Sequence, residues 1–428
     1  MRWLILPLLA ASMLAADCTS CSSNRPGDTG TEPDLDGDIT NDADAEANDS
    51  DAEAYDSDVE DEIPPEDADI SDGAITMDPV EIPRNRPGLD CGRGCTQVSF
   101  ADMVWAYYYD VGGRYIVYKG DTTRSPHIYD LESSKEYLLV GCDPHVGDLE
   151  NCLSPAVDKN IIIFSSRLFS DISDTPEITL WRYKIGDSYR YPLVTRRMTD
   201  YTAPLINIDV HQDMVSWWDS AIDPLGLYAM SLDGGEVIGL TRNECPCYGA
   251  PQLWGREVVY ESTRSWHDIW VVNIDTLEER DLNNDRVEQW TPAFDGRWVV
   301  WSDGRNDPCP LPSWDLCNTD IYGMAMPDGE IEPLCDHPAV QTHPDVHLGF
   351  VAWEDFRNAE DPNDGNARDA NIDIYLLDLD TRREVQVTNL PGPERMPRIW
   401  DHRLFYVAED LIGQQAIFMI DLDEAGLL

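Results

Sequence analysis

Carboxylates that follow several short apolar runs are the first groups in this sequence that could do chemistry. Four short apolar runs are each followed by an acid, and the four acids are Asp219, Asp303, Asp355 and Glu409. Acids gathered on one face of a fold can bind a cationic partner, so we predict that these four contribute to a binding face. Arg305 and Arg357 stand two positions after two of them. The alternative is therefore that Asp303 and Asp355 hold the arginines and shape a turn.

A polar loop near the C-terminal third concentrates oxygen ligands at Asp361, Asn363, Asp364 and Asp369. Calcium is a hard cation that prefers such ligands. The spacing differs from that of an EF-hand, because Gly365 falls one position early. A solvated polar loop is the alternative. We expect no cofactor unless this loop binds calcium.

Cysteines are plentiful, with 11 in the chain, and in an exported protein they indicate disulfides rather than metal ligands. The spacing predicts three short bridges, namely Cys142 with Cys152, Cys309 with Cys317, and Cys91 with Cys95. Three further thiols, Cys245, Cys247 and Cys335, leave one cysteine without a partner.

The segment between Cys309 and Cys317 is rich in proline and contains Trp314. A bridge would hold this loop in one conformation, as a recognition loop requires, so we predict Trp314 to be a binding residue. Packing of Trp314 on its own sheet is the alternative.

The N-terminus has the features of an export signal. Arg2 precedes an apolar run from Leu4 to Ala16 that is too short to cross a bilayer. Cys18 and Cys21 follow, at the place where bacterial lipoproteins are cleaved and acylated. We predict a signal over residues 1–21, lipidation at Cys18 or Cys21, and an outer-membrane location facing the periplasm or the cell surface. Cleavage and secretion without a lipid is the alternative.

Residues 22–90 are rich in Asp, Glu, Pro, Ser and Ala and have few large apolar side chains. Such a segment cannot bury enough surface to offset its ordering entropy, so we predict a disordered acidic tether. The formal net charge of −52 exceeds what this segment supplies, so the folded part is acidic as well. This charge excludes nucleic acid as a partner and limits membrane contact to the lipid anchor.

The remainder, residues 91–428, contains an internal repeat of roughly 41 to 53 residues. One column of the repeat holds the last large residue of an apolar run: Tyr118, Phe164, Trp217, Tyr260, Trp301, Trp353 and Val407. A second column heads the next run: Tyr129, Trp181, Tyr228, Trp270, Tyr322, Tyr375 and Phe418. Runs of β-branched and aromatic residues separated by Gly, Asp, Asn and Pro predict strands.

Four-stranded sheets repeated in this way bury both faces only by closing into a ring. We therefore predict a single all-β propeller with seven blades, or six if the first copy is only a lead-in. The last copy lacks a fourth strand before Leu428. We expect Thr96 to Phe100 to supply this strand and close the ring.

The best copy reads PAFDGRWVVWSDGRND followed by TDIYGM. This pattern resembles the repeat of TolB-like β-propellers over about three quarters of the chain. The resemblance implies a propeller at the bacterial envelope, but it does not imply one function, because propellers carry many.

Two functions fit these observations. The first is a non-enzymatic binding or scaffold module at the cell envelope, expected to be a monomer, that presents acidic, disulfide-braced loops to a protein or polysaccharide. The second is a metal-dependent polysaccharide lyase, since oligogalacturonate lyases also use a propeller with several histidines. The lyase requires at least three of five histidines to converge. They are His211, His267, His343, His347 and His402.

Overall fold

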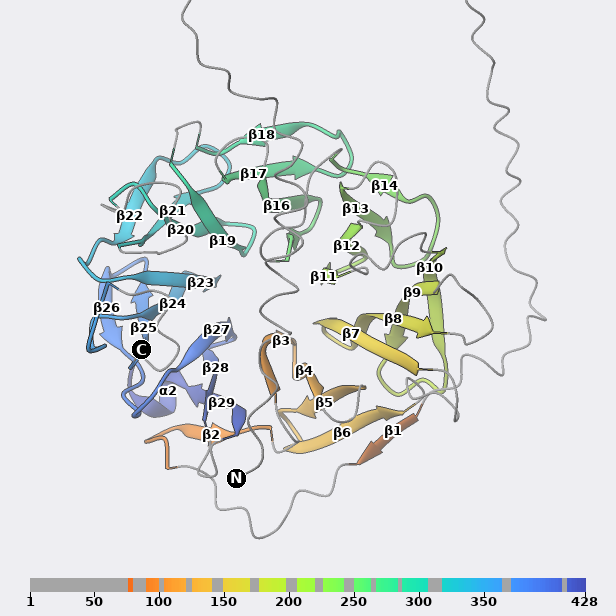
Figure 1. Ribbon diagram of the computed structural model, residues 1–428, viewed down its shortest axis with the longest axis horizontal. Coiled ribbons are helices and arrows are strands. Elements are labelled where there is room, and N and C mark those ends of the chain that lie inside the picture. Colours follow the sequence, from red (N-terminus) through yellow and green to blue (C-terminus); the bar gives the residue numbers. More distant parts are fainter. Residues whose placement is uncertain are drawn as a thin grey trace, which may run out of the picture.

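The computed structural model describes residues 76–79, 90–99, 104–120, 125–140, 149–169, 177–197, 206–219, 226–241, 250–262, 267–283, 287–306, 318–363, 371–409 and 414–428. Within these residues, seven antiparallel sheets surround one axis as the blades of a propeller (Figure 1). The predicted seven-bladed all-β fold is confirmed, and the six-bladed alternative is wrong. The predicted signal, residues 1–21, lies outside the described residues.

Each blade runs from an inner strand beside the axis to an outer strand at the edge of the ring (Figure 1). Blade 1 contains β3 (Val104–Gly112), β4 (Tyr115–Gly120), β5 (Pro126–Asp130) and β6 (Lys135–Val140). Blade 2 contains β7 (Leu149–Asp158), β8 (Ile161–Phe169), β9 (Glu177–Lys184) and β10 (Arg190–Arg197). Blade 3 contains β11 (Ile206–His211), β12 (Met214–Asp219), β13 (Gly226–Ser231) and β14 (Ile238–Gly239).

The second half of the ring repeats this order. Blade 4 contains β15 (Gln252–Trp254), β16 (Glu257–Ser262), β17 (Asp268–Asn273) and β18 (Glu279–Asp281). Blade 5 contains β19 (Gln289–Phe294), β20 (Trp298–Asp303), β21 (Asp320–Ala325) and β22 (Ile331–Cys335). Blade 6 contains β23 (Gln341–His347), β24 (Phe350–Asp355), β25 (Asp373–Asp378) and β26 (Arg383–Gln386). Blade 7 contains β27 (Arg395–Trp400), β28 (Arg403–Glu409) and β29 (Gln415–Asp421).

Blade 7 is completed by β2 (Cys95–Gln97), which comes from the other end of the chain. Thr96 pairs with Met419, and the N–H of Val98 continues the contact by donating to the carbonyl of Ile417 at 2.8 Å. The N–H of Ile417 donates in turn to the hydroxyl of Ser99 at 2.8 Å. The predicted ring closure is thus confirmed as far as Ser99, and Phe100 lies outside the described residues.

Blade 1 carries a fifth strand, β1 (Thr76–Pro79), which pairs antiparallel with β6. These four residues fall inside the range 22–90 that the composition assigned to the tether. Their backbone pairing places them in the propeller sheet instead. Apart from these four residues and Asp90, the predicted tether lies outside the described residues.

The first aromatic column of the repeat fills the interfaces between blades. Its members are fully buried in blades 1 to 6, and each packs against residues of the preceding blade. Trp353, for example, lies with Val300 of blade 5, and Trp301 lies with Val259 of blade 4. Because every neighbouring pair of blades shares such a cluster, the core is a ring of interfaces rather than one central mass.

The strand register corrects the repeat alignment in two copies. In blade 7, Tyr406 and not Val407 is opposite Phe418, and Tyr406 is the fully buried ring of that blade. In blade 1, Tyr118 is opposite His127 rather than Tyr129. Both errors arise because another ring is close by in sequence, Tyr406 next to Val407 and His127 two positions before Tyr129, and only the pairing distinguishes them.

Inner strands contain a bulge next to the repeat's proline. The register of β19, β23 and β27 shifts just there, between Trp290 and Ala293 in the first of them. The residue before the proline has a positive φ at Thr291 (49°), His343 (50°) and Met396 (53°). A side chain in this conformation is strained and persists only where surrounding contacts hold it.

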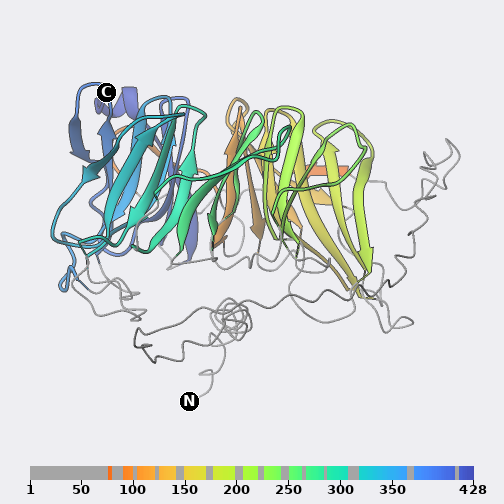
Figure 2. The same ribbon diagram turned by 90° about the horizontal axis from the view of Figure 1, so that it is seen from above.

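The two rims of the ring differ in what they carry. One rim, here the hairpin rim, holds the turns between first and second strands and between third and fourth strands. Helix α2 (Leu422–Ala425) and the C-terminus lie on it (Figure 2). The opposite rim, here the loop rim, is where second strands end and third strands begin. No helix in the described part of the chain is long and apolar enough to cross a membrane.

Candidate functional site

The acids predicted to form a binding face at the loop rim are mostly interior groups. Asp303 and Asp355 are both fully buried. Arg357 donates to Asp355 through Nε at 2.8 Å and through a terminal nitrogen at 2.6 Å, and Arg305 holds Asp303 in the same way. These contacts are those of the turn-shaping alternative, and they leave neither carboxylate on the surface.

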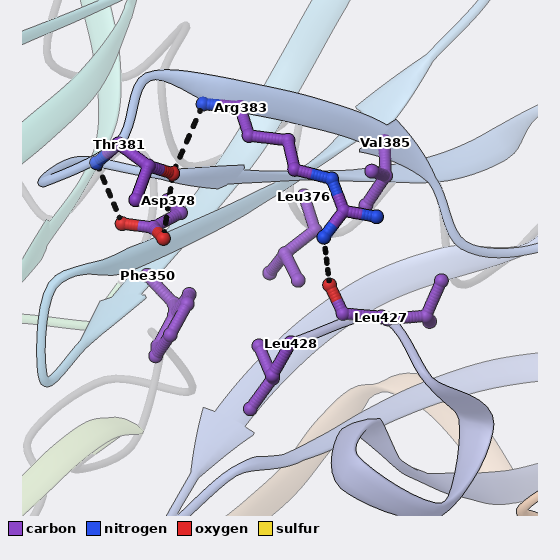
Figure 3. Close-up of a pocket in the computed structure, with 8 residues that line it drawn as sticks. All are labelled: Phe350, Leu376, Asp378, Thr381, Arg383, Val385, Leu427 and Leu428. Carbon is purple, nitrogen blue, oxygen red and sulfur yellow. Dashed lines mark hydrogen bonds between the residues drawn. The ribbon is translucent and has the colours of Figure 1, made fainter.

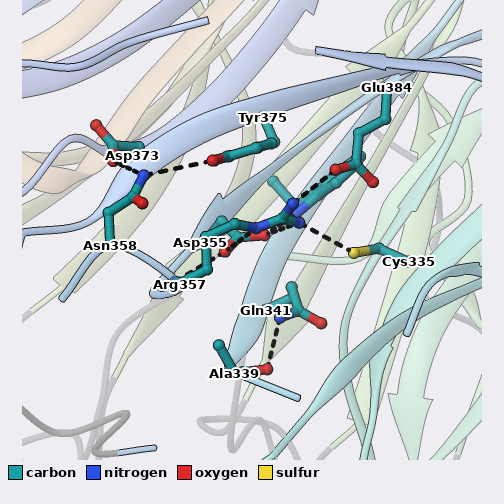
Figure 4. Close-up of polar contacts among 10 residues, drawn as sticks. Cys335, Ala339, Gln341, Asp355, Arg357, Asn358, Asp373, Tyr375 and Glu384 are labelled. Atoms are coloured by element: carbon teal, nitrogen blue, oxygen red, sulfur yellow. Dashed lines mark hydrogen bonds and ion pairs between the residues drawn. The ribbon is translucent and has the colours of Figure 1, made fainter. Parts of the chain in front are cut away.

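A second layer of contacts stabilises the same turn in blade 6 (Figure 4). The Arg357 guanidinium stacks 4.0 Å above the ring of Tyr375 and reaches Glu384 at 2.8 Å. Asn358 donates to Asp373 at 2.7 Å. Burial raises the pKa of the nearby Cys335 thiol to about 12, so this free cysteine is a thiol at neutral pH. Arg357 also donates to the sulfur of Cys335 in blade 5 at 3.4 Å, so the arrangement joins strands of blade 6 to one another and to the preceding blade.

Of the remaining predicted binding and metal residues, the structure describes Asp219, Glu409, Asp361 and Asn363. Asp219 is fully buried, whereas Glu409 is exposed at the end of β28. Asp361 and Asn363 are exposed, and the Asp361 carboxylate accepts the N–H of Asn363 at 3.2 Å. Trp314, Asp364 and Asp369 lie outside the described residues.

One of the three predicted disulfides is present in the described residues. Cys91 and Cys95 are bonded, with their Cα atoms 5.6 Å apart. The bridge stands directly before β2, so it braces the segment that closes the ring. For the other two predicted pairs, Cys142, Cys309 and Cys317 are outside the described residues, and the side chain of Cys152 is outside them too. Cys245 and Cys247 likewise cannot be placed.

A lyase would need at least three of the five histidines to converge, and the contacts of three of them are with separate acids. His267 lies 2.6 Å from Glu261 in blade 4, and His402 lies 3.2 Å from Asp423 on the hairpin rim. His343 lies 3.5 Å from the buried Glu354. Among the residues that the structure describes, no three His, Cys, Asp or Glu side chains are placed to hold a metal ion.

A small apolar pocket lies on the hairpin rim, between blade 6 and the C-terminal residues (Figure 3). Its volume is about 220 Å³, below the usual range of small-molecule sites. Arg383 crosses it and donates to the carbonyl of Leu427 at 3.2 Å. None of the predicted site residues line it.

A different set of charged side chains gathers at the axis of the ring. Asp110, Asp209 and Asp345 occupy the same position of inner strands β3, β11 and β23, eight residues before the buried aromatic of each blade. Arg398 occupies it in β27. We call the three acids the axial carboxylates. The search for repeated acids missed them, because their blades lie far apart in sequence and the remaining copies have Ala156, Gln252 and Ala293 there.

Each axial carboxylate also joins its blade to the next. Asp209 accepts the N–H of Leu253 in blade 4 at 2.6 Å and the N–H of its own neighbour Val210 at 2.8 Å. Asp110 accepts from Val157 at 2.7 Å, and Asp345 accepts from Ile399 at 2.6 Å. These bonds fix the orientation of the carboxylates.

The axial charges interact across the ring. Burial and the neighbouring Asp110 raise the pKa of Asp209 to about 8, while two backbone N–H groups and Arg398 oppose this shift. Burial raises the pKa of Asp345 to about 6, although Arg398 again opposes it. Asp209 lies on the inner strand of blade 3 and Arg398 on the inner strand of blade 7, so both residues stand beside the axis. Arg398 is 36 % exposed there and Asp345 13 %.

Two positions further along inner strands β11, β15, β23 and β27, four rings form what we call the axial ring arc. They are His211, Trp254, His347 and Trp400. Residues two apart on a strand point to the same side, so the arc faces the axis next to the carboxylates and nearer the hairpin rim. His211 stacks on Trp254 with centroids 4.2 Å apart, and His347 stacks on Trp400 at 4.5 Å. The rings of Trp254 and His347 are 6.4 Å apart, which joins the two stacks.

Comparison with solved structures finds propellers. The propeller domain of the trilobed protease from Pyrococcus furiosus, described as having an open velcro topology, matches with a TM-score of 0.52 and 13 % identity over 76 % of this chain and 95 % of that one. An oligogalacturonate lyase in complex with manganese matches with a TM-score of 0.50 and 12 % identity, over 81 % and 96 %. TolB from Acinetobacter baumannii matches with a TM-score of 0.37 and 11 % identity, over 72 % and 77 %.

No protein-family model and no curated protein matches this sequence. The strand topology therefore defines the class of protein, a seven-bladed β-propeller. At these identities the likeness concerns the fold alone.

Proposed function

We propose that this chain is a non-enzymatic binding module at the bacterial cell envelope, with the propeller as a rigid scaffold for recognition of a protein or polysaccharide. The observation that carries the proposal is the convergence at the axis of charged side chains from blades 1, 3, 6 and 7. A rigid scaffold that directs side chains from distant blades to one place is suited to binding.

The lyase is the second candidate, favoured by the likeness to the manganese-bound oligogalacturonate lyase. Two features weigh against it. The five histidines do not form a metal-binding set among the described residues. The axial carboxylates would also repel a polyanionic substrate at the centre of the ring.

A direct test compares binding with turnover. The mature chain would be incubated with polygalacturonate and manganese while unsaturated products are measured by ultraviolet absorbance. In parallel, its saturable binding to peptidoglycan and to purified outer-membrane fractions would be measured by biolayer interferometry. We expect binding without turnover, and binding that weakens in Asp345→Asn. Metal-dependent turnover would contradict the proposal.

The proposed envelope location is based on the predicted N-terminal signal and needs its own test. A palmitate analogue should label the chain in cells, and the label should be lost on replacement of the acylated cysteine. Separate Cys18→Ser and Cys21→Ser variants distinguish the two sites. Protease treatment of intact cells then separates surface display from periplasmic display, and label-free secreted protein would overturn the lipid anchor.

A further inference from the structure

We propose that the axis of the propeller recognises a cationic side chain, a lysine or arginine of a partner protein, between the axial carboxylates and the axial ring arc. This inference rests on the proposed binding function and names the ligand chemistry of that site.

Among the residues that the structure describes, the axial carboxylates outnumber the cation beside them. Three aspartates share the single guanidinium of Arg398, which lies 3.9 Å from Asp345. Backbone N–H bonds hold each carboxylate in place but bring no positive charge. A second cation at this level would therefore meet preorganised acceptors with negative charge that Arg398 leaves unbalanced.

Protonation is how this imbalance is relieved in the free protein. With a pKa of about 8, raised mainly by burial, Asp209 keeps its proton at neutral pH. An incoming ammonium or guanidinium group would displace this proton, because it supplies the positive charge that Asp209 lacks.

The acids alone would not define a ligand site, since each also joins two blades. The axial ring arc is the independent feature. It places the indoles of Trp254 and Trp400, both partly exposed, beside the carboxylates. The face of an indole attracts cations, and a lysine or arginine side chain also has an apolar stem that can lie along the rings.

The histidines of the arc add no competing charge at neutral pH. Burial lowers the pKa of His211, where Asp158 and Asp213 oppose the shift and Lys159 supports it. Burial lowers the pKa of His347 too, where Asp295 and Asp401 oppose the shift and His402 supports it. The two imidazoles therefore add no positive charge that would repel an organic cation at neutral pH.

Calorimetric titration of the mature chain tests the proposal. The probe is acetyl-Gly-Gly-Lys-Gly-Gly-amide, with the norleucine peptide as its uncharged match and calcium chloride as a separate arm. We expect one-to-one binding of the lysine peptide, tighter at pH 9 than at pH 6 and accompanied by proton release. The norleucine peptide should not bind.

The variants should change the affinity for the lysine peptide in opposite directions. Asp345→Asn should weaken peptide binding about tenfold, and Trp400→Leu about three- to tenfold. Arg398→Gln removes the resident cation and should strengthen binding several-fold. Asp209→Asn should abolish proton release. The control, Asp233→Asn, removes an acid with an 86 % exposed side chain away from the axis and should change affinity less than twofold.

Three outcomes would overturn the inference: equal loss in Asp345→Asn and Asp233→Asn, weaker binding in Arg398→Gln that retains the native unfolding midpoint, or binding of calcium but not of the lysine peptide. If the lysine peptide does not bind while envelope fractions still bind the chain without turnover, the inferred ligand class is wrong and the proposed function stands. If neither binds, the proposed function fails as well.

Discussion

The carboxylate of Glu354 in blade 6 accepts a hydrogen bond from the backbone N–H of Met396 in blade 7, with Oε1 2.8 Å from the nitrogen. Met396 is the strained residue of the β27 bulge, with φ of 53°. Glu354 is fully buried, and His343 and Arg395 each lie 3.5 Å from its carboxylate. One buried acid thus holds the bulge of the next blade's inner strand.

Two replacements of Glu354 should destabilise the ring to different degrees. Glu354→Ala removes both the acceptor for Met396 and the partner of Arg395, and should lower the free energy of unfolding by about 3 kcal/mol or more. Glu354→Gln keeps an acceptor oxygen and should cost about 1 to 2 kcal/mol. Urea denaturation measures both, with exposed Glu360→Gln as the control. Equal losses in the two Glu354 variants would show that the acceptor role is not the main one.

Ring closure by β2 should be sensitive to a single buried side chain. Val98 is 1 % exposed and packs with Tyr109 and Phe405 between blades 7 and 1. Val98→Ala should lower the unfolding free energy by roughly 2 kcal/mol, because it deletes buried methyl groups. Thr96→Ala, at an exposed position of β2, should cost far less. Similar denaturation midpoints for the two variants would contradict the closure argument.

The interior ion pair at the loop rim should govern stability rather than ligand binding. Asp355→Asn leaves the Arg357 guanidinium without its bidentate partner and should cost about 3 kcal/mol. The exposed acid Asp361 offers a matched change, and Asp361→Asn should stay within about 0.5 kcal/mol. Thermal and urea unfolding test both. A stable Asp355→Asn variant that loses ligand binding would restore the surface role predicted from sequence.

Stability should fall with rising pH because of Glu394. Burial raises the pKa of this fully buried carboxyl to about 8, with Asp373 adding to the shift and Thr388 opposing it. The folded state therefore binds a proton that the unfolded state releases near pH 4.5, so the stabilisation is complete below that pH and is lost as pH rises toward 8. Urea midpoints at pH 5, 7 and 9 should decline, and less steeply in Glu394→Gln. An identical slope in the variant would exclude Glu394 as a cause.

The ring arc depends on one glycine. A Cβ at Gly296 would lie 2.1 Å from Cδ1 of Trp254, and the residue has φ of 80°. Gly296→Ala should cost about 2 to 3 kcal/mol and change the near-ultraviolet circular dichroism of tryptophan. Gly349 has φ of 86° with nothing within 4 Å of its Cβ position, so Gly349→Ala isolates the backbone cost of about 1 kcal/mol. Unchanged tryptophan signals in Gly296→Ala would show that the turn adapts.

Local sequence pattern was enough to predict the blades. Strand propensity, turn residues and the spacing of aromatic columns all act between neighbours in sequence, so they revealed the strands, the repeat and the unfinished last copy that β2 completes. The same locality explains the correct pairing of Cys91 with Cys95, only four positions apart. It also explains the failures at Val407 and Tyr129, where a residue one or two positions away fitted the pattern as well.

The tertiary structure alone decided which polar residues are accessible and which meet. Asp303 and Asp345 are both acids at recurring positions of the repeat. Asp303 is buried and paired with Arg305, whereas Asp345 interacts with charges from blades 1 and 7. Closing the ring brings together side chains such as Asp209 and Arg398, which lie 189 positions apart in the sequence. The desolvation and charge coupling at the axis depend on that closure, because they arise from distances that no local pattern of residues specifies.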